Sequence, residues 1–166
     1  MRETVWYGLT QLGIAHTAAS LVAIASGAWA LVRYREITTR SGLGRTYLLT
    51  TLLTAATALF IFQRGNFGPG HVLALMTLVA LAIGMLAATT RAFGGASRVA
   101  QAIAFTSTAL FHTIPGFTEA LTRLPFGNPV LDSVEAPEFK PVYGTLLALF
   151  AIGLFFQLRW IRRSAA

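Results

Sequence analysis

Uncharged apolar stretches, each about as long as a bilayer core is thick, recur along this chain. They lie near residues 7–32, 46–63, 71–90, 99–114 and 142–158. A helix needs ~20 such residues to cross ~30 Å of hydrocarbon, and only helices and closed barrels satisfy their backbone hydrogen bonds inside lipid. Stretches of this length favour helices. The sequence therefore predicts an all-α membrane protein built as a bundle of five transmembrane helices.

The composition agrees with a membrane protein and excludes several kinds of site. Of the 166 residues, 55% are hydrophobic and 11% are charged, and the mean hydropathy is +0.64. We interpret residues 1–166 as a single transmembrane domain. The absence of cysteine excludes disulfides, iron–sulfur clusters and thiolate metal sites. The net charge of +7 is carried by residues at the ends of the apolar stretches, so we expect no nucleic-acid partner.

The loops between the stretches alternate in charge, which predicts the orientation of the chain. Nine of the thirteen basic residues fall on one side: Arg33, Arg35, Arg40, Arg45, Arg91, Arg98, Arg159, Arg162 and Arg163. Five of the six acids fall on the other side: Glu3, Glu119, Asp132, Glu135 and Glu138. The positive-inside rule then places the amino terminus outside and the carboxyl terminus in the cytoplasm. We expect a multi-pass protein of a bacterial inner membrane. The first stretch is too long for a signal-peptide core and is interpreted as a span.

The longest segment between spans, residues 115–141, is expected on the outer side. Residues 116–124 predict a short amphipathic helix lying at the outer surface, in which Glu119 and Arg123 pair at i, i+4. Several prolines follow and predict an extended or turning path. This outer segment is expected to cover the ends of the bundle or to contact a partner.

Three histidines, His16, His71 and His112, are the only titratable side chains predicted inside the spans, all toward the outer side. They are candidate ligands for a b-type haem or a metal ion. At the helical rise per residue, His16 lies ~10 Å deeper than the other two, so His71 and His112 form the more natural pair. Arg64 and Arg123 are candidate partners for haem propionates. His71 is also expected to suit an interfacial position that reaches headgroups and water.

Structural roles are an equally good interpretation of the polar residues in the spans. A histidine in a membrane helix often forms an interhelical hydrogen bond, and small residues beside it allow close packing. Thr50, Thr54 and Thr57 follow one another at helical spacing, and we expect their hydroxyls to bond back to i−4 carbonyls or across to a neighbouring helix. No acid lies inside any predicted span, which argues against a proton-coupled or ion-coupled transporter acting alone.

Three short motifs resemble a bacterial family of small predicted membrane proteins known only as a domain of unknown function. They are the run 16–27, the sequence Gly44–Arg45–Thr46–Tyr47 and the pair Gly70–His71, and the resemblance covers residues 13–115. It implies a further histidine in the loop before Gly44, where this chain has Arg40 instead. The helical layout is also similar to that of small b-type cytochromes.

Two functional hypotheses follow from these patterns. The first is an integral membrane accessory or scaffold subunit that docks onto other membrane-protein subunits of a larger complex. The alternative is a small membrane redox protein that holds a b-type haem or a metal through the outer-side histidines and exchanges electrons with a quinol.

Overall fold

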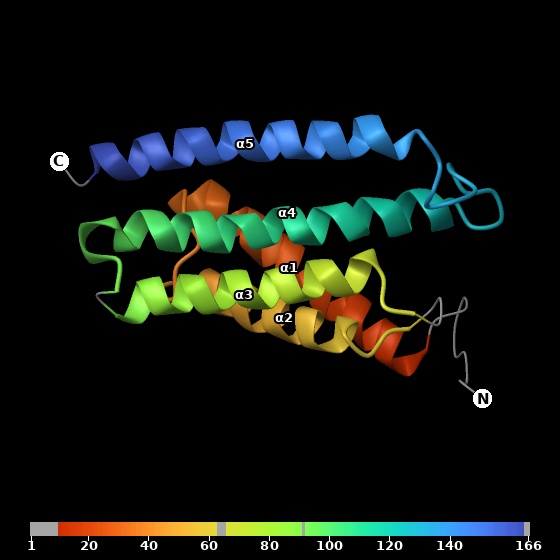
Figure 1. The fold of residues 1–166 in the computed structure, drawn as a ribbon, viewed down its shortest axis with the longest axis horizontal. Helices are drawn as coiled ribbons and strands as arrows, with labels where there is room; N and C mark the ends of the chain where they lie inside the picture. The colour runs from red at the N-terminus through yellow and green to blue at the C-terminus, as the bar shows by residue number, and fades with distance from the viewer. Residues whose placement is uncertain (1–9, 63–65, 91, 165–166) are drawn as a thin grey trace.

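The computed structural model describes residues 10–62, 66–90 and 92–164, and this part of the chain is helical without a strand. Its helices are α1 (Gln11–Tyr34), α2 (Gly42–Ala58), α3 (Pro69–Thr89), α4 (Ser97–Arg123) and α5 (Phe139–Arg163), with a short 3-10 helix η1 (Gly94–Ala96) before α4. Their connections alternate between the two ends of an elongated bundle (Figure 1). The all-α prediction is confirmed.

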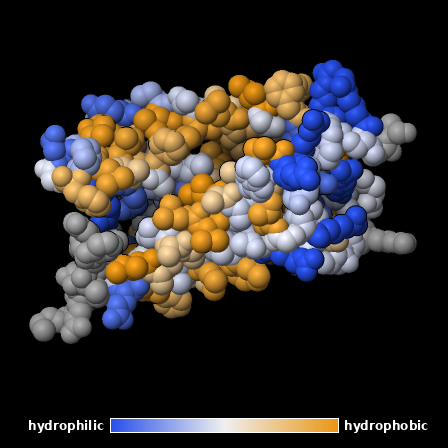
Figure 2. Space-filling model, turned by 180° about the vertical axis from the view of Figure 1, so that it is seen from behind, coloured by the Kyte–Doolittle hydropathy of each residue, from blue (hydrophilic) through white to orange (hydrophobic). Residues whose placement is uncertain are grey.

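Among the described helices, α1, α3 and α5 are long and apolar enough to cross a membrane. Figure 2 shows hydrophobic side chains through the middle of the molecule and hydrophilic ones gathered toward both ends. This is the surface expected of a protein whose middle lies in hydrocarbon and whose ends lie among headgroups and water. The finding suggests a membrane protein.

The helices begin where the sequence supplies caps. The hydroxyl of Thr10 accepts a hydrogen bond from the Gly13 amide at 3.1 Å, and that of Ser41 accepts one from Gly44 at 3.0 Å. Such caps satisfy amides that have no partner within the helix. Helix α3 begins with Pro69, whose missing N–H costs nothing at the first helical position.

Helix α4 corrects the prediction for the outer segment. It runs unbroken from Ser97 through Pro115 to Arg123, so residues 116–124 do not form a separate helix. The connection between α4 and α5 covers only residues 124–138, and not the whole outer segment predicted at 115–141. A proline removes one backbone hydrogen bond, which neighbouring contacts in a packed helix can compensate. The carbonyl that loses its amide donor to Pro115 is that of Phe111, one turn earlier. The Thr118 hydroxyl separately donates to the Ile114 carbonyl at 2.8 Å.

The connection from α4 to α5 folds back on the end of α4. The Val130 amide donates to the Leu124 carbonyl at 3.0 Å, and the Leu131 amide donates to Leu121 at 2.9 Å. The predicted pairing of Glu119 with Arg123 is confirmed by an ion pair. Helix α5 then starts at the buried Phe139, three residues before the start predicted for the fifth span.

The core lies among α1, α2, α3 and α4. Helix α1 packs mainly on α2, α3 packs mainly on α4, and α2 also contacts α3. Two aromatic rings fill the space beside glycines: a Cβ atom at Gly27 would lie 2.5 Å from the Tyr47 ring, and one at Gly84 would collide with the Phe105 ring. Tyr47 and Phe105 are both fully buried. Helix α5 lies along one side of this core beside α4 (Figure 1).

Candidate functional site

His16 on α1 bonds to the carboxyl-terminal half of α2. Its Nδ1 atom lies 3.1 Å from the Thr54 carbonyl oxygen and 3.0 Å from the Thr57 hydroxyl. A carbonyl only accepts, so the neutral imidazole donates its proton from Nδ1, and this partner assigns the tautomer. The Nε2 atom of His16 therefore keeps its lone pair.

The threonine row on α2 behaves as predicted. The hydroxyls of Thr50, Thr54 and Thr57 donate to the carbonyls of Thr46, Thr50 and Leu53 at 2.7–2.8 Å. Back-bonding of this kind satisfies hydroxyls inside an apolar surrounding. Thr57 and the Thr54 carbonyl then serve as the partners of His16, so the predicted cross-helix contact is formed as well.

His112 on α4 is buried and bonds to the middle of α2. Its Nε2 atom lies 3.1 Å from the Thr51 hydroxyl, and its ring meets the Tyr47 ring edge-on with centroids 6.2 Å apart. His112 thereby links α4 to α2.

A pair of bonded hydroxyls lies in the core near His112. The Thr108 hydroxyl donates to the Phe105 carbonyl at 2.7 Å, so it must accept from the Tyr47 phenol, which lies 2.5 Å away. Tyr47 and Thr108 thereby link α2 to α4, and both buried hydroxyls have hydrogen-bond partners.

His71 is held differently from the other two histidines. It lies in the first turn of α3, where its Nδ1 accepts from the Gly68 amide at 3.1 Å. Its ring lies 4.6 Å from that of Phe62 and 5.0 Å from that of Phe67, measured between centroids. With 6% of its surface exposed, it is not the water-facing interfacial residue considered as one alternative. Its Nε2 carries the proton and has no hydrogen-bond partner among the described residues.

The predicted ligand set is therefore not assembled as one cluster. His16 and His112 each form a hydrogen bond to α2. His71, which was expected to pair with His112, lies at the start of α3 between two phenylalanine rings. Among the described residues, no group of three or more His, Asp and Glu side chains could hold a metal ion. Arg123 pairs with Glu119, and Arg64 lies outside the described residues.

Aromatic rings fill the space beside two glycines of the core. The small residue Thr108 is bonded to Tyr47, whose ring occupies the space beside Gly27, and the Phe105 ring occupies the space beside Gly84. A groove of about 680 Å³ does run between α3 and α4. Its lining consists of Ser107 and of apolar side chains, among them Phe67 and Phe111. None of the three histidines lines it.

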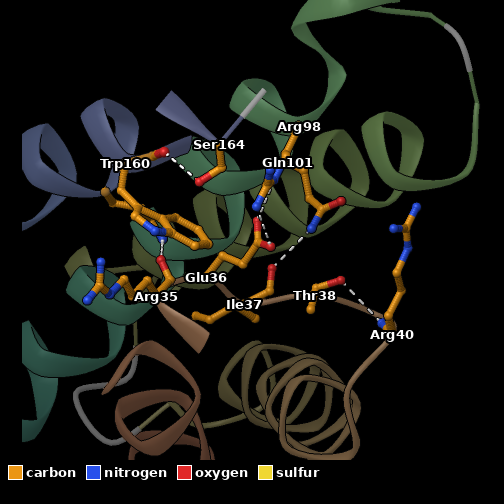
Figure 3. A network of polar contacts seen from close by, with 10 residues as sticks. Arg35, Glu36, Ile37, Thr38, Arg40, Arg98, Gln101, Trp160 and Ser164 are labelled. Atoms are coloured by element: carbon orange, nitrogen blue, oxygen red, sulfur yellow. Dashed lines mark hydrogen bonds and ion pairs between the residues drawn. The ribbon is translucent and has the colours of Figure 1, made fainter. Parts of the chain in front are cut away.

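Sequence reasoning missed a second polar network, at the arginine-rich end. Figure 3 shows it joining the α1–α2 loop to α4 and α5. Arg98 donates to both Glu36 carboxylate oxygens at 3.1 and 3.0 Å, and Gln101 donates to the Ile37 carbonyl at 3.1 Å. Gln157 donates to the Arg35 carbonyl at 2.8 Å and accepts from Thr106. The available signal was Glu36, the one acid on the basic side of the predicted bundle.

Comparisons with known proteins find no match: no family model, no curated protein and no solved structure corresponds to this chain. The resemblance based on its short motifs stays a prediction. Its function is therefore inferred from its own residues and their contacts.

Proposed function

We propose that this chain is an integral membrane accessory or scaffold subunit of a larger complex in a bacterial inner membrane. The observation that carries the proposal is the exposure of α5. Only 6% of its most apolar stretch is buried within the chain, against 28% for α3. Large side chains such as Leu149, Ile152 and Phe155 are more than half exposed there. In a complex, this face of α5 meets a neighbouring membrane protein.

The proposal includes five spans. Helix α2 has 17 residues, a length of ~26 Å at the α-helical rise, close to the hydrocarbon thickness. Helix α4 carries no charged residue between Arg98 and Glu119, which leaves an uncharged stretch of spanning length. Alternation of the connections between the two ends of the bundle supports this layout (Figure 1).

The proposed orientation has the amino terminus outside and the carboxyl terminus in the cytoplasm. The α1–α2 connection, the α3–α4 connection and the end of α5 lie at one end of the bundle (Figure 1). These are the segments that carry nine of the thirteen basic residues. An excess of Lys and Arg near span ends marks the cytoplasmic side.

In this proposal the histidines of the core are packing residues. His16 fastens α1 to α2, and His112 fastens α4 to α2. Interhelical hydrogen bonds of this kind help to hold membrane helices together, because the hydrophobic effect does not drive helices together inside lipid. The core is thereby kept rigid while α5 presents its apolar face to the partner.

Site-specific photocrosslinking in native membranes tests the proposal. A photoreactive residue replaces Phe155 on α5, and a matched one replaces Leu53 on α2, since the two side chains are 60% and 56% exposed. We expect one protein adduct of fixed stoichiometry from position 155 and lipid adducts alone from position 53. Lipid adducts alone from both positions would contradict the accessory role.

A second candidate function is the small redox protein, and the tautomer of His16 favours it. Donation from Nδ1 to the Thr54 carbonyl leaves Nε2 as a free lone pair, which is how metal-binding histidines are usually held. An absorption spectrum of the purified protein, oxidised and then reduced with dithionite, tests this function. A Soret band that disappears in His16→Ala supports haem binding, and reduction of that haem by an added quinol then tests the electron exchange. A featureless, metal-free sample from haem-replete cells contradicts it.

A further inference from the structure

The arginine-rich end of the bundle carries a charge excess that its own acids do not balance. Seven described arginines there have no acidic partner in the structure: Arg33, Arg35, Arg40, Arg45, Arg159, Arg162 and Arg163. Glu36 is the acid at this end, and Arg98 occupies both of its carboxylate oxygens. The other described acids lie at or beyond Glu119, toward the opposite end. Within the part of the chain that the structure describes, the acids therefore do not balance the charge of this end.

Part of this charge converges on one tryptophan. The Arg35 guanidinium carbon lies 5.8 Å from the centroid of the Trp160 ring, and that of Arg98 lies 5.1 Å from it. Figure 3 shows Arg35 and Trp160 side by side where the end of α1 meets the end of α5. Arg163 follows Trp160 at i+3 and shares its helical face. We call Arg35, Trp160 and Arg163 the arginine junction.

The backbone at Arg35 is unusual in a way that positions its side chain. Arg35 ends α1 in the left-handed conformation, with φ of 60°, where glycine is the usual residue because a side chain is disfavoured. Its carbonyl is fixed by Gln157 of α5 at 2.8 Å. The chain thus keeps a strained arginine at a position that glycine fits better, and its guanidinium lies beside Trp160.

We propose that the arginine junction binds the phosphate of an anionic membrane lipid headgroup. A guanidinium group can donate two parallel hydrogen bonds to the oxygens of one phosphate. Tryptophan is typical of the headgroup layer. Trp160 lies in the last turns of α5, after its apolar run and next to the basic residues at its end. The inference rests on the chain lying in a membrane, not on the accessory role of α5. Inorganic phosphate shares the chemistry and is separated by the experiment.

Fluorescence quenching by brominated lipids tests the site. The Trp6→Phe, Trp29→Phe double variant leaves Trp160 as the single tryptophan, and the protein is placed in bilayers of brominated phosphatidylglycerol or brominated phosphatidylcholine. We expect phosphatidylglycerol to occupy the site severalfold more tightly, about fivefold for each arginine engaged. Equal quenching by the two lipids would overturn the proposal.

Two substitutions and one matched control locate the effect. Arg35→Gly removes the guanidinium while allowing the left-handed backbone, and Arg163→Gln removes a cation on the face of Trp160. Each is expected to lower the preference about fivefold. Arg40→Gln removes the same charge from the same end, but Arg40 lies on the far side of Glu36 from Trp160 (Figure 3) and its removal should leave the preference unchanged. An equal loss in Arg40→Gln would mean diffuse attraction and overturn the site.

Inorganic phosphate provides the second arm. Added at millimolar concentration to the same bilayers at constant ionic strength, it should not displace brominated phosphatidylglycerol from Trp160. Complete displacement would assign the arginine junction to free phosphate and overturn the lipid proposal.

Discussion

Helix α5 is attached to the molecule mainly near its two ends, whereas α1 to α4 share a continuous buried core. At one end the Tyr143 hydroxyl lies 2.7 Å from that of Thr118. At the other, Gln157 bonds to the Arg35 carbonyl and to Thr106. Between these contacts most large side chains of α5 are exposed. In the core, by contrast, aromatic rings pack against glycines, and the hydroxyls of Tyr47 and Thr108 are hydrogen-bonded to each other.

This difference separates the part of the chain that carries its internal stability from a helix that is mostly exposed. Changes in the core should alter the free energy of unfolding because they affect tightly packed groups that cannot relax. Changes on the middle of α5 should leave unfolding nearly unchanged, because that face has little to lose within the chain. The following substitutions compare the two regions in matched pairs.

The largest effect is expected from Gly84→Ala. The new methyl group collides with the buried Phe105 ring, and overpacking of this kind typically costs about 1–3 kcal/mol. Gly153→Ala on α5 is the matched control, because a Cβ there has no atom within 4 Å. It should be neutral or stabilise by up to about 1 kcal/mol through helix propensity. Unfolding in a mixed-detergent titration measures both, and equal losses would refute the contrast.

The next largest effect is expected from Tyr47→Phe. Removal of this phenol leaves the Thr108 hydroxyl without its donor, in a fully buried place. The free energy of unfolding should fall by about 1–2 kcal/mol. Tyr143→Phe on α5 loses one half-buried contact and should cost about 0.6 kcal/mol. The same titration compares them, and a larger loss at Tyr143 would mean that α5 belongs to the core.

The helical class and the threonine contacts were predictable because both depend on local pattern. Uncharged stretches of spanning length predict helices from composition alone, and a threonine in such a helix bonds back to a carbonyl one turn away. The end of α4 was not predictable in the same way. Pro115 favours a break on local grounds, yet the helix continues, and Thr118 also contacts Tyr143 of α5.

The candidate site depended on tertiary contacts that spacing along the chain does not reveal. Depth along each predicted helix favoured His71 with His112, but depth says nothing about which way a helix is rotated. The structure turns His112 toward Thr51, while His71 is enclosed by Phe62 and Phe67. Tyr47 was noted only as part of a short motif. Its hydrogen bond to Thr108 could be predicted only with the knowledge that α4 places Thr108 beside it.

A smaller global effect is expected from Gln157→Ala, which removes the bond to Arg35 and the partner of Thr106. The loss in unfolding free energy should stay near 1 kcal/mol or below, because the core does not depend on this side chain. Amide hydrogen exchange should speed up at the end of α5 and remain unchanged in α2 and α3. Thr145→Ala, at an exposed position of α5, is the control. Faster exchange throughout the bundle would show that α5 and the core unfold as one unit.

The smallest effect is expected from His71→Phe, although His71 is as deeply buried as His112. The substitution removes the bond from the Gly68 amide, which should cost about 1 kcal/mol. It also removes a buried N–H that has no acceptor, and relief of an unsatisfied donor returns about the same amount. A phenyl ring keeps the stacking with Phe62 and Phe67, so the net change should be close to zero. His112→Phe provides the comparison, since it breaks a satisfied bond to Thr51 and should cost about 1–2 kcal/mol. A large loss in His71→Phe would show that Nε2 has a partner in the membrane, and would move His71 from helix capping to ligand binding.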